Sequence, residues 1–183
     1  MENWREIWER KGKDDSVDFK VLDGFEDTEI DFYLVVCGIV ESLKIGKEDS
    51  ILEVGCGAGA IAQYLRSQSY VGIDYSKSMV RRHIELLKNS VLYGEANDLP
   101  FKDESFDHVI CFSVFQYFPD KGYAMEALKE ISRVARSGVY IGDIPERSHR
   151  ESHLTYQRDF FQGGIITEGF YTKDRFNVYW RLV

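Results

Sequence analysis

Three glycines with alternating spacing, Gly55, Gly57 and Gly59, are the residues best placed for chemistry in this sequence. They follow a short apolar run, residues 51–54, that suits a buried parallel strand. Glycine adopts positive φ readily, and because it has no Cβ, a ligand can lie directly against the main chain at the start of a following helix. The pattern predicts a ligand-binding turn between a strand and a helix. A turn that needs only positive φ is the simpler alternative.

The spacing of this turn leaves the kind of ligand open. A dinucleotide-binding loop, G-x-G-x-x-G, needs a small residue three positions after Gly57, and Ala60 meets that requirement loosely. A second apolar run, residues 70–73, ends in Asp74. This carboxylate follows the turn by about 20 residues, the distance expected of an acid that binds ribose hydroxyls. The two landmarks together predict a ligand that contains a ribose.

Four blocks of the sequence resemble the class I S-adenosylmethionine-dependent methyltransferases. Glu53 with the glycines resembles the first motif of that family, and Asp74 resembles the acidic position that follows it. Segment 94–101 resembles the adenine-binding segment, and segment 105–111 resembles the fourth strand with its lead-in. The blocks stand in the order of the family, from residue 50 to about residue 143. In this family the glycine loop faces the methionine part and the ribose, not a pyrophosphate.

The resemblance implies S-adenosyl-L-methionine as cofactor, S-adenosyl-L-homocysteine as product, and no metal. The cofactor-binding residues it implies are Glu53, Gly55, Cys56, Gly57, Gly59, Asp74, Tyr75, Met79, Glu95, Ala96, Asp98, Leu99, Phe112 and Ser113. One position departs from the family. Glu95 stands where many members have an aspartate that contacts the adenine amino group, so we expect that contact from the longer Glu95 or from Asp98.

The elements that must position these residues alternate between strands and helices. Strands are expected at 51–54, 70–74, 91–93, 106–112 and 139–144, with a crossover helix after the glycines and helices over 28–45, 76–87 and 123–135. Thr28 with Asp31 is the expected capping box of the helix over 28–45. Ser76 is the expected N-cap of the helix over 76–87. This order predicts an α/β fold with a parallel sheet and right-handed crossovers.

The resemblance implies a Rossmann-like, doubly wound, mostly parallel seven-stranded sheet with an antiparallel edge strand. Residues 176–183 are the candidate for that edge strand. Because few residues separate the fifth strand from that end, we expect an abbreviated C-terminal part. The length of 183 residues suits a single domain. We expect N-terminal helices and a substrate lid over 1–45, the cofactor-binding core over 50–144, and a substrate segment with closing strands over 145–183.

Charge and composition favour a small-molecule acceptor. The net charge is −8, with 23 Lys and Arg against 31 Asp and Glu, which argues against a nucleic-acid partner. Arg81, Arg82 and His83 form a compact basic cluster, which we expect on a solvated helix face. An Asn-Pro-Pro-Tyr-like segment is absent after the fourth strand, which disfavours nucleobase methylation.

The three cysteines show neither a disulfide framework nor a zinc-site spacing, and we expect Cys37 in the core. No apolar run reaches the ~18 residues of a membrane span, and the first residues lack the features of a signal peptide. These observations predict a soluble cytoplasmic protein.

Methyl transfer requires an aligned nucleophile and, for a hydroxyl acceptor, a base that removes its proton. The candidate catalytic residues are His149, His153 and Tyr117, followed by Asp143; a solvated histidine is the alternative for the first two. We expect a small polar metabolite or a sugar-like hydroxyl compound as acceptor. The expected walls of its pocket are Trp4, Trp8, Tyr117, His149, His153 and Tyr156.

Two other functions use the same sequence features. An NAD-dependent oxidoreductase would share the sheet, although the third glycine of its loop is missing here. A non-catalytic S-adenosylmethionine-binding module would keep the pocket without the reaction.

Overall fold

The computed structural model describes residues 3–65, 69–147 and 152–182 of the chain. Seven strands of this part form one sheet: β1 Ser50–Val54, β2 Ser69–Asp74, β3 Ser90–Tyr93, β4 Phe106–Phe112, β5 Ala135–Pro145, β6 Ile165–Glu168 and β7 Arg175–Arg181. Their order is β3-β2-β1-β4-β5-β7-β6. The first five pair in parallel, whereas β7 runs antiparallel to both β5 and β6. The Rossmann-like, mostly parallel seven-stranded sheet expected from the sequence is confirmed.

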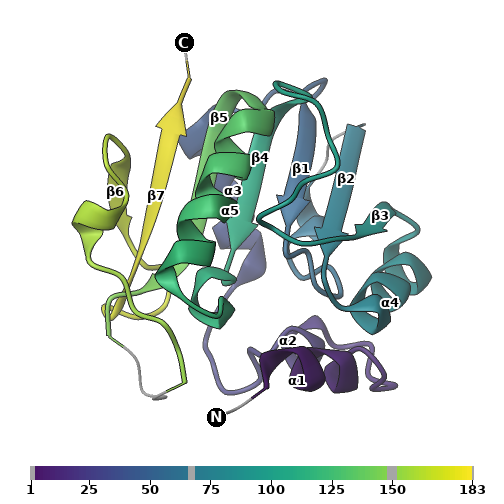
Figure 1. The fold of residues 1–183 in the computed structure, drawn as a ribbon. Helices are drawn as coiled ribbons and strands as arrows, with labels where there is room; N and C mark the ends of the chain where they lie inside the picture. Colours follow the sequence, from purple (N-terminus) through teal and green to yellow (C-terminus); the bar gives the residue numbers. More distant parts are fainter. Residues whose placement is uncertain (1–2, 66–68, 148–151, 183) are drawn as a thin grey trace.

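Helices cover the sheet and its carboxyl edge (Figure 1). They are α1 Trp4–Lys11, α2 Phe19–Leu22, α3 Phe32–Leu43, α4 Lys77–Leu87 and α5 Lys121–Val134, with single 3₁₀ turns at Ala62–Tyr64, Phe115–Tyr117 and Arg158–Phe160. In Figure 1, α5 lies in front of the sheet and α3 behind it. Two buried apolar clusters fill the two interfaces, one with Ala127 and Ile131 of α5 and one with Val35 and Ile39 of α3.

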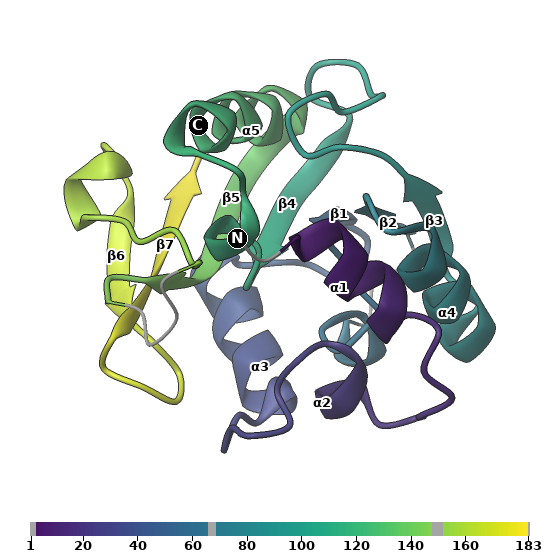
Figure 2. The ribbon, with the colours of Figure 1, turned by 60° about the horizontal axis from the view of Figure 1, so that its bottom comes forward.

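The N-terminal helices α1 and α2 lie beyond the carboxyl ends of the parallel strands, as Figure 2 shows from below. Asn3 caps α1 by accepting from the Arg5 N–H, and α1 packs beside α4. Glu9 accepts from the Lys77 N–H at 2.7 Å and so joins the two helices. The chain before the sheet therefore covers the edge at which ligands bind in such sheets.

The prediction of a crossover helix after the glycines is wrong. Only a 3₁₀ turn, Ala62–Tyr64, is present in the described residues of that connection. The physical reason is length, because residues 60–68 must also bring the chain back to the start of β2. The N–H groups of Ala58 and Ala60 in the connection donate to Asp23, the residue after α2, instead of opening a helix.

Two boundaries also differ from the sequence predictions, and a third agrees. Asp31, not Thr28, caps α3, because its carboxylate accepts from the Tyr33 N–H at 2.9 Å while the Thr28 hydroxyl donates to the Phe25 carbonyl. The strand β5 starts at Ala135, directly after α5, because Ala135 already pairs with Phe106 of β4. Ser76 caps α4 as expected and accepts from the Met79 N–H.

At the C-terminal side of the sheet, β7 lies inside and the short β6 forms the edge, whereas residues 176–183 were expected to form the edge. The buried Phe176 and Val178 of β7 fit the inner position. In the described residues between β5 and β6, the Arg158–Phe160 turn stands where a helix would, so the connection is abbreviated. Cys37, expected in the core, is exposed on α3.

Candidate functional site

The glycine turn after β1 has the backbone conformation that only glycine adopts without strain. Gly55, Gly57 and Gly59 have φ of 72°, 49° and 113°. A Cβ on Gly55 would run into Val114, and one on Gly57 would run into the carboxylate of Asp23. The turn therefore requires glycine both for its positive φ angles and for the close approach of Val114 and Asp23 to the main chain.

Two carboxylates hold the N–H groups of this turn. Asp74 accepts from the Gly57 N–H at 3.0 Å and from the Ser76 N–H at 2.8 Å. Asp23 accepts from the Ala58 N–H at 2.7 Å and from the Ala60 N–H at 2.9 Å. Because these N–H groups already donate to protein anions, the turn offers few free donors to an anionic ligand such as a pyrophosphate.

A cavity of about 80 Å³, here called the loop cavity, lies against the turn. Three carboxyl groups line it: Asp23, Glu53 and Asp74. Burial raises the pKa of Asp23 to about 7, of Glu53 to about 8 and of Asp74 to about 6. The Tyr70 hydroxyl donates to Glu53 at 2.7 Å, which opposes the rise for that residue. A cationic ligand in the loop cavity would favour the ionised forms of these three carboxyl groups.

The other walls of the loop cavity come from the ends of β1, β2 and β4. Of the residues predicted to bind cofactor, the cavity collects Glu53, Gly55, Cys56, Gly57, Asp74, Tyr75, Met79, Phe112 and Ser113. Burial keeps the pKa of the Cys56 thiol well above its usual value, so it remains a neutral wall. The carboxyl edge of the sheet therefore brings together residues up to 60 positions apart in the sequence.

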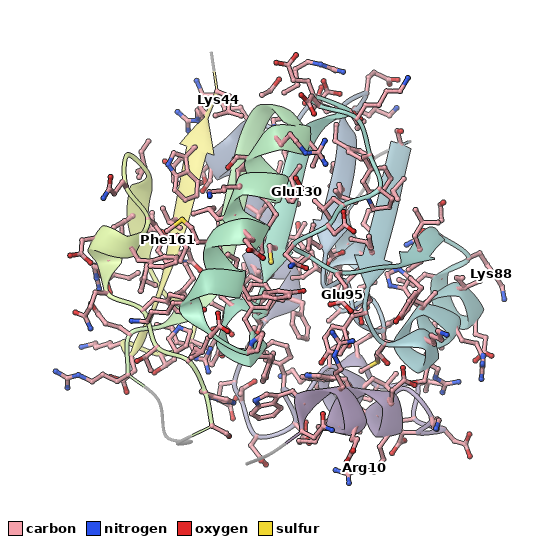
Figure 3. All side chains as sticks on the ribbon, in the orientation of Figure 1. Arg10, Lys44, Lys88, Glu95, Glu130 and Phe161 are labelled. Atoms are coloured by element: carbon pink, nitrogen blue, oxygen red, sulfur yellow. The ribbon has the colours of Figure 1, made fainter. Side chains whose placement is uncertain are left out.

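A second cavity of about 450 Å³, the Glu95 cavity, opens on the other side of Asp74. It is lined by Asp74, Tyr75, Glu95 and Ala96 among others. The Glu95 carboxylate accepts from Arg5 of α1 at 2.7 and 2.8 Å and from the Tyr123 hydroxyl at 2.9 Å. Figure 3 shows Glu95 at the lower end of the sheet, above α1. Asp74, expected to bind ribose, and Glu95, expected near the adenine, thus line one cavity.

Three residues predicted to bind cofactor have other surroundings. The Asp98 side chain is exposed, and its N–H bonds back to the Glu95 carbonyl at 3.4 Å. Leu99 is buried in the apolar core, where its N–H donates to Glu130. A Cβ on Gly59 would meet Leu87 and the His83 ring, so Gly59 serves the packing of α4. Of the two candidates for the adenine contact, Glu95 is the one that faces a cavity.

A third cavity of about 560 Å³, the polar cavity, meets the loop cavity at Trp8, Phe25, Ser113 and Tyr117. Its walls carry both signs of charge, from Lys11, Glu26, Asp27, Glu29, Arg147, Asp174 and Arg175. A mixed charged lining of this kind suits a polar molecule with several hydrogen-bonding groups.

Aromatic rings gather around Tyr117 at the junction of the cavities. The Tyr117 ring centroid lies 4.7 Å from that of Trp4, 5.1 Å from that of Trp8 and 5.4 Å from that of His153. The predicted wall residues Trp4, Trp8, Tyr117 and His153 are therefore brought together from both ends of the chain. His149 lies outside the described residues.

Two other candidates are structural. Tyr156 is fully buried, and its hydroxyl donates to the Phe115 carbonyl at 2.9 Å, so it packs the core rather than lining the acceptor pocket. Asp143, a candidate base, is buried with φ of 59° and forms an ion pair with Arg175 at 3.0 Å. Arg175 also donates to Gln116. Burial raises the pKa of Asp143 while Arg175 opposes the rise. A carboxylate engaged in this way is poorly placed to take a substrate proton.

Asp23, Arg5 and His83 were not predicted to belong to the site. His83, expected on a solvated face, is buried, and its Nδ1 lies 3.1 Å from the Gly57 carbonyl oxygen. Asp23 and Arg5 reach the site from the N-terminal segment, over 35 and 90 positions of sequence. No local pattern signals such contacts, because they depend on how α1 and α2 fold over the sheet.

Two further observations concern metal binding and membrane spans. In residues 3–65, 69–147 and 152–182, no three His, Cys, Asp or Glu side chains are grouped so that they could hold a metal ion. Within the same ranges, no helix has the length and apolar character that crossing a membrane requires.

The chain is similar to a protein family and to several known proteins. Residues 52–141 match the model of a methyltransferase domain. A fatty-acid O-methyltransferase of Mycolicibacterium smegmatis is 35% identical over 111 residues, covering 52% of this chain and 39% of that protein. A probable tRNA methyltransferase 9B of Mus musculus is 30% identical over 110 residues, covering 55% of this chain and 23% of that protein. The chain thus spans less than half the length of either relative.

Among solved structures, the fold is similar to that of magnesium protoporphyrin IX methyltransferase from Synechocystis PCC 6803 with bound S-adenosylhomocysteine. The TM-score is 0.65 at 17% identity, and the similarity covers 95% of this chain and 91% of that one. This likeness covers most of the chain and supports the fold, whereas the family model matches residues 52–141.

Proposed function

The chain belongs to the class I S-adenosylmethionine-dependent methyltransferase family, and we propose that it transfers a methyl group from this cofactor to a small polar acceptor. The bound cofactor supplies a methyl group on a positively charged sulfur, which an aligned nucleophile displaces. The observation that carries the proposal is the junction at Ser113 and Tyr117, where the loop cavity opens into the larger polar cavity. Cofactor and acceptor would meet there.

The residues present fit this cofactor. Gly55 and Gly57 both line the loop cavity, and Asp74 lines both of the cavities that the methionine and adenosine ends would use. Asp74 would accept from the ribose, and Glu95 would accept from the adenine amino group. The three carboxyl groups of the loop cavity suit the positive charges of the methionine end.

The same features speak against a dinucleotide. A pyrophosphate binds through free N–H groups at a glycine turn. Here the N–H groups of Gly57, Ala58 and Ala60 donate to Asp74 and Asp23. Three neighbouring carboxyl groups would repel the phosphates as well.

Tyr117 and His153 are the described residues that would handle the acceptor proton. Both line the polar cavity, and their ring centroids are 5.4 Å apart. A histidine at this place can accept the proton of an acceptor hydroxyl. A tyrosine or histidine can also orient the hydroxyl oxygen toward the methyl group of the sulfonium. His149 stays a candidate from sequence alone. Trp4 and Trp8 would cover the acceptor from α1 and exclude water.

The lining of the polar cavity favours a small polar metabolite or a sugar-like hydroxyl compound. Relatives are named for a fatty acid and for tRNA. A fatty-acid chain would lie unfavourably among the charged side chains of Glu26, Asp27, Glu29 and Asp174. A polyanionic RNA is disfavoured by the net charge of −8. We further propose that the chain acts as one domain in the reducing cytoplasm, without a membrane or nucleic-acid partner.

Transfer of label from methyl-labelled S-adenosylmethionine to a panel of small hydroxyl and amine compounds tests the proposal. Labelled product with a polar compound, lost in a Tyr117→Phe, His153→Ala double variant, is the expected result. Labelling of fatty acids or tRNA alone would contradict the acceptor class. Cofactor binding without labelling of any compound, in a chain that binds the panel compounds, would favour a non-catalytic binding module.

A further inference from the structure

The polar cavity has one buried charged side chain among the described residues that line it. This residue is Arg175, the first residue of β7, which is 8% exposed. The other charged residues of the lining are exposed or half-buried: Lys11, Glu26, Asp27, Glu29, Arg147 and Asp174. Water and salt screen exposed charges far more than a buried one. An ionic group of a bound molecule therefore interacts most strongly with Arg175.

The guanidinium of Arg175 uses only one of its nitrogens within the described protein. Its Nη1 donates to the Asp143 carboxylate at 3.0 Å, to the Asp143 carbonyl at 2.9 Å and to the Gln116 side chain. Among the described residues, Nε and Nη2 donate to no acceptor. The described side-chain atoms that are both fully buried and without a partner include neither nitrogen, so both can be reached from the cavity that Arg175 lines.

The two unused nitrogens form the edge of a guanidinium that matches a carboxylate. Nε–H and one Nη2–H point in parallel from the planar group, so the two oxygens of a carboxylate can accept from both at once. Asp143 contacts Nη1 and leaves this edge open. Donors of a buried cation that have no partner are costly, and an anionic group on this edge removes that cost.

Gln116 connects Arg175 to the place where cofactor and acceptor would meet. Its Oε1 accepts from Arg175, and its Nε2 donates to the Ser113 hydroxyl at 3.0 Å. Ser113 lines both the loop cavity and the polar cavity. One glutamine side chain therefore separates the guanidinium from a residue of the junction, a span that a small molecule can bridge.

We propose that Arg175 is a specificity-determining residue and that the acceptor is a small hydroxyl compound bearing a carboxylate, which the Nε and Nη2 edge binds. This inference rests on the proposed function, whose polar acceptor class it narrows. The carboxylate is an anchor and takes no part in the transfer, whereas the hydroxyl faces the junction at Ser113. A phosphate monoester could use the same edge, but its second negative charge is disfavoured by the four acids of the cavity wall.

Titration of the wild-type chain, saturated with S-adenosylhomocysteine, with matched compounds tests the proposal by NMR. The probes are glycolate and glycolamide, 4-hydroxybenzoate and 4-hydroxybenzamide, and glucuronate and glucuronamide, with inorganic phosphate as the other anion. We expect at least one carboxylate to bind saturably and to shift the Nε–H resonance of Arg175. Its amide, which keeps the shape without the charge, should do neither.

A matched pair of variants sharpens this test. Arg175→Lys keeps a positive charge beside Asp143 and removes the paired N–H groups of the guanidinium. It should weaken binding of that carboxylate on the order of tenfold, the cost of one charge-assisted hydrogen bond. Arg147→Lys, the same change at an exposed arginine of the same cavity, should leave the affinity unchanged. If Arg175→Lys does not fold, the wild-type comparison of carboxylate with amide decides.

The proposal would be overturned if no carboxylate shifted the Arg175 resonance, if the amide bound equally well, if phosphate alone bound, or if both variants lost affinity alike. A carboxylate that binds at Arg175 but accepts no labelled methyl group would support the anion site and count against the proposed methyl transfer. A wild type that does not bind S-adenosylhomocysteine would refute the proposed function, and this inference with it.

Discussion

At the scale of single residues, Asp74 lines both cavities of the proposed cofactor site. Its oxygens accept from the N–H groups of Gly57 and Ser76. Each carboxylate oxygen can accept more than one hydrogen bond, so Asp74 can hold the turn and still bind ribose hydroxyls. Its position between the loop cavity and the Glu95 cavity explains why one acid can serve both roles.

We therefore expect Asp74→Ala to weaken S-adenosylmethionine binding by ~1 to 3 kcal/mol, the cost of removing a charged hydrogen-bond partner. Calorimetry measures this loss. Asp98→Ala is a sharp comparison, because Asp98 was a sequence candidate whose side chain is exposed. That variant should bind like the wild type. Equal losses in both variants, or unchanged affinity in Asp74→Ala, would count against the assignment of the ribose acid.

Gly57→Val tests the turn itself. The φ of Gly57 is 49°, and a Cβ there would run into the Asp23 carboxylate. The variant should lose cofactor binding while its far-ultraviolet circular dichroism remains that of the wild type. Gly46→Val is the matched control, because a Cβ on Gly46 meets nothing closer than Asp49 at 3.4 Å. A Gly57→Val protein that still binds would show that the turn is only a connection.

At the scale of elements, β5 and β7 are joined beneath the polar cavity by the buried pair of Asp143 and Arg175. Both side chains are buried, with 3% and 8% exposure, so neither charge can be screened well by water. The pair fixes the end of β5 against the start of β7, and Gln116 extends it toward the loop that carries Tyr117.

Arg175→Met should lower the free energy of unfolding by roughly 3 to 5 kcal/mol, because it leaves a buried carboxylate without its partner. Arg158→Met provides the contrast, since Arg158 forms more exposed pairs with Glu146 and Glu168. Loss of such surface pairs costs about 0 to 1 kcal/mol. Urea denaturation of the two variants measures both values. Similar losses would show that the Asp143 pair carries no special structural role.

The parts of the fold that local pattern determines could be predicted from the sequence. Apolar runs with flanking turn residues predicted β4 at 106–112 with its observed bounds, and Ser76 as the cap of α4. The crossover helix could not be excluded, because its apolar spacing was helical while the length of the connection allowed only one turn. The inner position of β7 depends on its pairing with β6, which is a contact between strands and has no signature within either.

In the candidate site too, residues in local sequence motifs could be predicted, whereas residues placed by tertiary contacts could not. The glycines, Asp74 and Glu95 lie within recognisable segments at strand ends, and the parallel sheet gathers strand ends at one edge. Asp23, Arg5 and His83 contribute through contacts that depend on the tertiary packing of α1, α2 and α4. Asp98 and Leu99 fall within a matching segment, yet the chain turns there so that one is exposed and the other is buried in the core.

At the scale of the whole molecule, an acidic chain buries carboxyl groups at the centre of its site, which makes stability depend on pH. In the unfolded chain a glutamate loses its proton near pH ~4.3. In the folded protein, burial raises the pKa of Glu53 to about 8. Between these pH values the folded state holds a proton that the unfolded state has released, so raising the pH lowers stability across this window.

The free energy of unfolding of the ligand-free protein should therefore fall from about pH 5 to about pH 8, and should fall less in Glu53→Gln. Glutamine keeps an oxygen that can accept from Tyr70 and has no charge to develop. Urea denaturation at several pH values measures both curves. Parallel curves for the two proteins would show that Glu53 does not contribute to the dependence.

The central claim is that the cavities at the carboxyl edge of the sheet bind S-adenosylmethionine. Calorimetric titration of the wild-type chain with S-adenosylmethionine and, separately, with NAD tests it most directly. We predict saturable binding of one S-adenosylmethionine per chain and no binding of NAD, because the N–H groups that a pyrophosphate would need donate to Asp23 and Asp74. Binding of NAD in preference to S-adenosylmethionine, or binding of neither, would contradict the account.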